Sequence, residues 1–172
     1  MTPAVLLLTL VTIERLGELW IARRHTIALL ARGAHEVAPG HYPAIVLLHA
    51  FWLSGLWVIG SAAPIDSGWL AIFLALQIVR FWVMITLGKR WTTRIIVLPH
   101  APLITTGPYR FLSHPNYLVV IGEIAVLPLC LQLPWYALAF SVANIAVLAI
   151  RIRAEHEALH GRRAIEPFEA KT

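Results

Sequence analysis

Five apolar stretches, each close in length to a membrane-spanning helix, run through this chain of 172 residues. A helix rises about 1.5 Å per residue, so about 20 residues cross a hydrocarbon layer of about 30 Å. Hydrophobic residues make up 59% of the chain and charged residues only 13%, against about 25% charged in soluble domains. We therefore predict an all-α integral membrane protein with about five transmembrane helices, over residues 3–22, 43–62, 68–88, 116–133 and 134–150.

The last two stretches are the shortest, and they meet at Gln132, Leu133 and Pro134. A junction this short predicts a tight helical hairpin, since neighbouring antiparallel helices are joined by short loops. The long polar segments, at 23–42, 89–115 and 151–172, all lie on the side of the predicted membrane opposite this hairpin turn. Any chemistry is therefore expected on that side. We treat the chain as a single domain, with three spans over 1–88, a connector over 89–115, the hairpin over 116–150 and a C-terminal helix and tail over 151–172.

The basic residues mark one side of the predicted membrane. Of the 14 Lys and Arg residues, Arg15 and Arg80 fall within spans, and the other 12 all follow the first, third or fifth span. Because loops rich in Lys and Arg stay in the cytoplasm, the N-terminus is predicted to be external and the C-terminus cytoplasmic. Because this one-sided distribution accounts for the excess of positive charge, no basic patch is left for nucleic acid, and the expected partner is the lipid bilayer. The 12 are Arg23, Arg24, Arg32, Lys89, Arg90, Arg94, Arg110, Arg151, Arg153, Arg162, Arg163 and Lys171.

The densest polar motif, Gly-Pro-Tyr-Arg-Phe-Leu-Ser-His-Pro-Asn-Tyr at residues 107–117, stands just before the fourth span. Proline favours the first helical position and disfavours a helical residue before it, so His114 is the expected N-cap. The free N–H groups and the positive dipole end there suit a carboxylate or phosphate, toward which His114 and Tyr117 can project. The alternative is that the motif only caps a helix and that Tyr117 belongs to an interfacial aromatic belt.

A polar stripe continues from the fifth span into the C-terminal segment. Ser141, Asn144, Leu148, Arg151 and Glu155 are spaced 3, 4, 3 and 4 residues apart, so they share one helical face. Arg151 and Glu155 extend this face into the cytoplasm, where they are candidates for a site. The alternative is a capping or snorkelling pair without a catalytic role.

Charged residues also occur inside the predicted spans, namely Glu14, Arg15, Glu18, Arg80 and Glu123. An Arg or Asp at a span centre costs about 2.5–3.5 kcal/mol on insertion scales, so such groups normally face a partner or a wet cavity. We expect Arg80 to pair with one of the acids between helices, in a structural role.

Several kinds of site are not expected. The histidines show no spacing typical of metal ligands, and the single cysteine lies in an apolar run, so no metal site is predicted. The chain also has no Rossmann or P-loop glycine motif, and a nucleotide-type cofactor would have to bind without those folds.

The motif at 107–117, the apolar hairpin and the segment Arg-Ile-Arg-Ala-Glu-His-Glu-Ala-Leu at 151–159 together resemble the isoprenylcysteine carboxyl methyltransferase family. These are membrane methyltransferases that use S-adenosylmethionine. The family's Gly-x-Tyr, His-Pro-x-Tyr and Arg-x-x-x-Glu-Glu motifs match here, except that His156 replaces the second glutamate and Ser113 stands where an arginine commonly precedes His-Pro. The resemblance implies cofactor-binding roles for Gly107, Tyr109, His114, Pro115, Tyr117 and Glu155, and catalytic roles for Arg151 and Glu155.

Upstream segments extend the resemblance to a bacterial branch of the family. Glu-Arg-Leu-Gly-Glu-Leu at 14–19, His-Tyr-Pro at 41–43 and Leu-Gly-Lys-Arg-Trp-Thr-Thr-Arg at 87–94 are similar to members associated with O-methylation of long-chain alkylpyrones. This branch implies a bacterial inner-membrane enzyme with a cytoplasmic cofactor pocket and a lipophilic acceptor, an alkylpyrone or a prenylated compound, that arrives laterally from the bilayer. The methyl group would pass to a carboxylate or an acidic hydroxyl, with an arginine positioning the anion.

Two other readings remain open. The nearer one is an NADPH-dependent reductase of the steroid 5α-reductase type, which has a related helical membrane core. The more distant one is a non-catalytic membrane subunit or small carrier. Titration with each cofactor separates the three.

Overall fold

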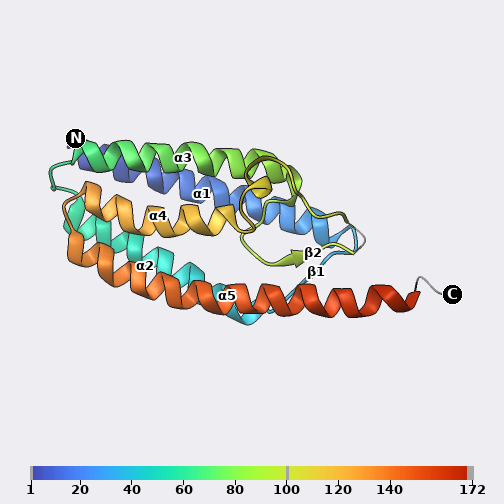
Figure 1. The fold of residues 1–172 in the computed structure, drawn as a ribbon. Helices are drawn as coiled ribbons and strands as arrows, with labels where there is room; N and C mark the ends of the chain where they lie inside the picture. Colours follow the sequence, from blue (N-terminus) through green and yellow to red (C-terminus); the bar gives the residue numbers. More distant parts are fainter. Residues whose placement is uncertain (1, 100, 170–172) are drawn as a thin grey trace.

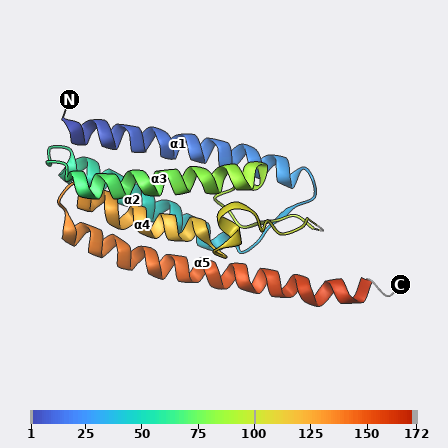
Figure 2. The same cartoon turned by 45° about the horizontal axis from the view of Figure 1, so that its top comes forward.

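Five long helices lie side by side in the computed structural model, which describes residues 2–99 and 101–169, without the side chains of His41 and of residues 154–169. Figures 1 and 2 show that the helices run along one common direction, and that the end of α5 projects beyond the others. The five predicted spans each correspond to one of these helices. Their bounds are α1 Pro3–Leu30, α2 Tyr42–Gly60, α3 Ser67–Leu87, α4 Pro115–Cys130 and α5 Pro134–Glu169.

Among the described residues, three helical segments are long and apolar enough to cross a membrane: Tyr42–Gly60, Ser67–Arg90, which is α3 with the short helical turn that follows it, and Pro134–Arg153. Helix α4 is apolar but has only 16 residues, and α1 has the length but carries three charged side chains near its middle. Large apolar side chains cover the outside of the bundle, and Ile85, for example, is 78% exposed. An apolar outer surface of this kind is expected of an integral membrane protein, because lipid and not water surrounds it.

The two ends of the bundle differ in content. One end holds the N-terminus, the short loop before α3 and the turn between α4 and α5, whereas the loop of residues 31–41 and the connector of residues 88–114 gather at the other (Figure 1). We call this second end the connector end. A two-stranded antiparallel ladder links its two segments, because β1 (His35–Glu36) pairs with β2 (Ile96–Val97).

Helix boundaries follow local chemistry. Asp66 caps α3, since its side-chain oxygen accepts hydrogen bonds from Gly68 N and Trp69 N at 2.9 and 3.0 Å. The hairpin turn is tight as predicted, but α4 ends at Cys130, before residue 133, because Gln132 adopts a left-handed φ of 57° that no helix continues. Helix α1 runs past the predicted residue 22 to Leu30.

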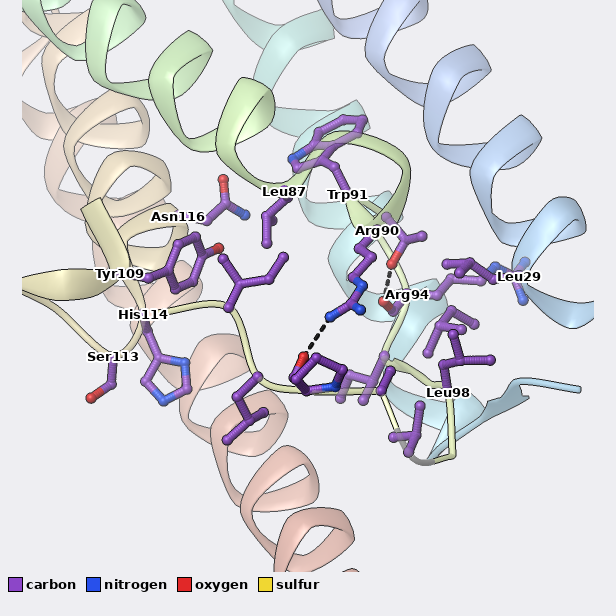
Figure 3. A pocket seen from close by; sticks show the side chains of 18 of the residues that line it. Leu29, Leu87, Arg90, Trp91, Arg94, Leu98, Tyr109, Ser113, His114 and Asn116 are labelled. Atoms are coloured by element: carbon purple, nitrogen blue, oxygen red, sulfur yellow. Dashed lines mark hydrogen bonds between the residues drawn. The ribbon is translucent and has the colours of Figure 1, made fainter. Parts of the chain in front are cut away.

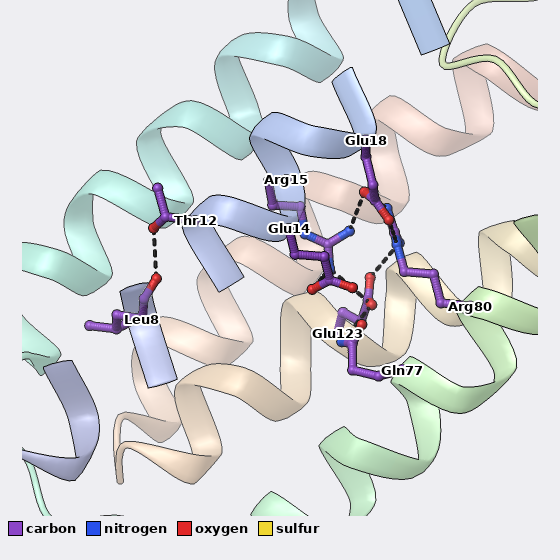
Figure 4. A network of polar contacts seen from close by, with 8 residues as sticks. All are labelled: Leu8, Thr12, Glu14, Arg15, Glu18, Gln77, Arg80 and Glu123. Carbon is purple, nitrogen blue, oxygen red and sulfur yellow. Dashed lines mark hydrogen bonds and ion pairs between the residues drawn. The ribbon is translucent and has the colours of Figure 1, made fainter. Parts of the chain in front are cut away.

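A network of buried charges joins three helices at mid-bundle (Figure 4). The Arg80 guanidinium of α3 bonds both oxygens of Glu18 in α1, and its Nη1 lies 2.7 Å from Glu123 Oε2 in α4. Arg15 lies 2.9 Å from Glu18 and from Glu123, and Gln77 Nε2 donates to Glu123 Oε1 at 2.9 Å. The expected interhelical pairing of Arg80 is confirmed, and it involves two acids. These ion pairs fix the relative positions of α1, α3 and α4.

Candidate active site

Two cavities share a wall at the connector end of the bundle. The larger, about 530 Å³, lies under the connector, and we call it the connector cavity. The smaller, about 300 Å³, lies between α1, α2, α4 and α5, and we call it the membrane cavity. Both volumes fall in or close to the range of about 300–1,000 Å³ typical of small-molecule sites. The residues that line both are Trp91, Thr92, Asn116, Tyr117 and Arg151.

The connector folds over the first cavity and forms much of its lining (Figure 3). Arg90 Nη1 donates to the carbonyl of Pro102 at 2.6 Å, which ties the two halves of the connector together. The carbonyl of Trp91 lies 2.9 Å from His25 Nδ1, so the C-terminal part of α1 also anchors the connector. These contacts give an irregular segment a fixed shape, which a binding site requires.

Side chains from the two predicted motifs meet in the shared wall. Arg151 Nε donates to Tyr117 Oη at 3.0 Å, and Arg151 Nη1 donates to the carbonyl of Thr93 at 2.9 Å. The guanidinium carbon also lies 5.4 Å from the centre of the Tyr117 ring. The His114 ring stacks on the Tyr117 ring, with ring centres 5.0 Å apart and planes 12° apart. Residues 34 positions apart in the chain therefore form one continuous polar surface.

The remaining predicted residues occupy different places. Tyr109 lines the connector cavity, whereas Gly107 and Pro115 are not among the described residues that line either cavity. Gly107 has a φ of 58°, and a Cβ there would lie 2.5 Å from Thr86 Oγ1, so the backbone and its packing require glycine. Pro115 is buried at the first position of α4, and His114 is its N-cap as predicted, although the His114 side chain makes no capping bond. The Glu155 side chain lies outside the described residues, so its pairing with Arg151 stays a prediction.

Sequence reasoning missed two polar groups of the shared wall. Trp91 Nε1 and Asn116 Oδ1 are buried, and neither has a hydrogen-bond partner among the described residues. A buried unpartnered polar atom calls for an explanation, and a bound ligand is one. The position of Asn116 directly after His-Pro was a usable signal, whereas Trp91 stands in a connector without periodicity.

The connector cavity is positively charged. Arg90, Arg94 and Arg151 line it, and among its described lining residues there is no Asp or Glu. Arg94 is 2.8 Å from Glu36, and that hydrogen bond to the carboxylate raises the pKa of the guanidinium above its ordinary value. The described part of the chain contains no cluster of three metal-ligand side chains. An anionic or oxygen-rich ligand therefore fits this cavity better than a metal ion.

The membrane cavity is mostly apolar and opens sideways. Leu16 and Leu19 of α1 and Val46 of α2 line it, yet these side chains also lie on the outer surface, and Leu16 is 61% exposed. The cavity therefore reaches the surface of the bundle between α1 and α2, where lipid surrounds it.

These features define a helical membrane protein in which a cavity lined by arginines at one end adjoins a more apolar cavity between the helices. The family model described as the isoprenylcysteine carboxyl methyltransferase family matches residues 69–161, which include nearly all of α3, the connector, the hairpin and Arg151. The chain belongs to this family of membrane methyltransferases.

Two relatives match over most of their length. YpbQ of Bacillus subtilis is 38% identical over 160 residues, which cover 90% of this chain and 95% of the relative. An uncharacterized protein of Haemophilus influenzae is 28% identical over 154 residues, or 84% of this chain and 88% of the relative. No solved structure matches the chain significantly.

Proposed function

We propose that the protein transfers a methyl group from S-adenosylmethionine, bound in the connector cavity, to an oxygen of a lipophilic acceptor bound in the membrane cavity. The observation that carries this proposal is the shared wall, where Tyr117 and Arg151 line both the arginine-containing connector cavity and the more apolar membrane cavity. A charged ligand and an apolar ligand can meet at this wall, which contains the described residues that the two cavities have in common.

The described residues offer partners for the carboxylate and the amino groups of the cofactor. The cavity volume suits a molecule of this size, the arginines suit its carboxylate, and the unpartnered Asn116 Oδ1 can accept a hydrogen bond from an amino group. His114, Tyr109 and Tyr117 also line this cavity and provide aromatic surface. When bound, S-adenosylmethionine supplies a methyl group on a positively charged sulfur. We propose that Glu155 orients Arg151 or contacts the ammonium group of the cofactor.

The chain's own contribution to catalysis is positional. Holding two reactants in line can lower a barrier by about 7–11 kcal/mol. Arg151 presents a planar fork of donors, which can hold a carboxylate or an enolate oxygen in place. Because such an oxygen is already ionised near neutral pH, no strong base is needed. Proposed acceptors are long-chain alkylpyrones, which the sequence branch favours, and prenylated compounds, and both suit an apolar cavity open to the bilayer.

The proposal also includes an orientation. The connector end holds the loop cations, so we infer that it is cytoplasmic and that the N-terminus lies outside the bacterial inner membrane. Ala62 is exposed in the loop before α3, at the opposite end of the bundle. A cysteine at Ala62 should react with an impermeant thiol reagent in intact cells. Protection of that cysteine until the cells are lysed would reverse the orientation.

Titration of the detergent-solubilised protein with S-adenosylmethionine tests the function. We expect His114→Ala and Tyr117→Phe to weaken binding at least fivefold without unfolding the protein. Tyr136→Phe is the matched control, since the Tyr136 hydroxyl donates to Trp52 O at 2.8 Å and lines neither cavity among the described residues. Unchanged affinity in both site variants would contradict the assignment. Binding of NADPH in place of S-adenosylmethionine would favour a reductase, and binding of neither would favour a non-catalytic subunit.

A further inference from the structure

The membrane cavity contains a polar group that nothing described in the protein binds. The amide nitrogen of Asn144 is buried, its residue is 3% exposed, and it has no hydrogen-bond partner among the described residues. Asn144 lines the membrane cavity but is not among the described residues that line the connector cavity. A buried donor without a partner lowers the stability of a folded protein. The simplest reason for an asparagine at this position is therefore a ligand that accepts a hydrogen bond from it.

The depth of Asn144 places this donor away from the shared wall. Asn144 and Arg151 are seven residues apart on one face of α5, which is about 10 Å along a helix axis. Over residues 144–151 the predicted stripe is confirmed, since Asn144 and Leu148 are buried on the face that carries Arg151. The Glu155 side chain lies outside the described residues. A ligand held at Arg151 by one oxygen can extend along this face toward Asn144.

A second polar side chain lines the same cavity from α2. His49 Nδ1 lies 2.8 Å from the carbonyl of Ile45, so Nδ1 carries the proton and donates. This leaves Nε2 as the ring nitrogen that can meet a ligand, as an acceptor when the ring is neutral. The cavity thus offers an unpartnered donor on α5 and an acceptor on α2, beside the ion-paired side chains of Arg15, Glu18 and Arg80, which also line it.

We propose that the acceptor carries a second oxygen, separate from the methylated one, which accepts a hydrogen bond from Asn144 inside the membrane cavity. This inference rests on the proposed function. The substrate class is a lipophilic molecule whose compact head group bears two separated oxygens, and whose tail leaves between α1 and α2. Asn144 then determines specificity for the head group, while Arg151 acts at the reacting oxygen.

A pair of probes that differ by one oxygen tests this directly. Pentadecylresorcinol and pentadecylphenol have the same tail and ring, and only the first has a second hydroxyl group. Calorimetric titration of the full-length protein in detergent, with and without S-adenosylhomocysteine, should show at least tenfold tighter binding of the resorcinol. In Asn144→Leu the two affinities should come within twofold of each other. Val142→Leu, on the lipid-facing side of the same helix, should keep the tenfold ratio.

Thermal stability separates this role from a structural one. If Asn144 only supported the fold, Asn144→Leu would lower the melting temperature, whereas removal of an unpartnered donor should leave it equal or higher. Equal affinities in the wild-type protein, failure of both probes to bind, or a tenfold ratio retained in Asn144→Leu would each overturn the inference. Wild-type protein that binds no S-adenosylmethionine would instead overturn the proposed function, because the probe comparison does not need the cofactor.

Discussion

The mid-bundle charge network and the shared wall of the two cavities each contain an arginine between helices, but the partners of the two guanidinium groups differ in charge. Arg80 meets two carboxylates, from Glu18 and Glu123, and all of these groups are buried. The described partners of Arg151 are neutral, a tyrosine hydroxyl and a backbone carbonyl. A guanidinium that is neutralised by carboxylates stabilises packing, whereas one whose described partners are neutral can present its charge to an anionic ligand.

The largest effect is expected at Arg80. Arg80→Met removes one of the two arginines that pair with Glu18 and Glu123 and leaves Arg15 alone beside both buried carboxylates. Breaking a buried pair costs about 3–5 kcal/mol. We expect a marked fall in the melting temperature in detergent and in the yield of folded protein. Arg24→Met is the control, because Arg24 is exposed, lies over the ring of Trp20 and has no ion pair among the described residues. Near wild-type stability of Arg80→Met would show that the network does not hold the helices together.

A smaller effect, on turnover and not on folding, is expected at Arg151. Arg151→Lys keeps the charge but loses the fork of donors, so initial rates should fall at least tenfold, or about 1.4 kcal/mol of transition-state stabilisation. The affinity for S-adenosylmethionine and the melting temperature should change much less. Rates close to wild type would leave Arg151 a structural role, and catalysis would then have to be sought in residues 107–117.

The smallest effect is expected at the surface pair of Arg94 and Glu36. The two side chains are 40% and 20% exposed, and exposed pairs contribute about 0–1 kcal/mol. Glu36→Gln should therefore shift the melting temperature only slightly, and high salt should remove the difference from wild type. A large, salt-independent loss would mean that the β1–β2 ladder depends on this ion pair.

The sequence predicted the helices, the hairpin and the pairing of Arg80 because each follows from a local rule or from the cost of charge in lipid. The ladder could not be predicted, since two-residue strands about 60 positions apart leave no periodic pattern. That Tyr117 and Arg151 belong to one site was implied by the resemblance of motifs. Helix geometry shows which residues share a helical face, but not which helices pack against each other.

The membrane cavity was hidden for a different physical reason. Its apolar lining, Leu16 and Val46 for example, has the same composition as a lipid-facing surface, so no pattern in the chain separates the two. Asn144 was visible as part of a stripe, but its lack of a partner became apparent only when the surrounding helices were in place.

The wall that the two cavities share has a thermodynamic consequence. A ligand that draws Arg151 toward one cavity changes what the other cavity offers, because the same side chain lines both. Occupancy of the two sites is then energetically linked, and linkage is reciprocal: whatever factor the cofactor applies to acceptor affinity, the acceptor applies to cofactor affinity. Spent cofactor that stays bound would therefore also set how readily the methylated lipid returns to the bilayer.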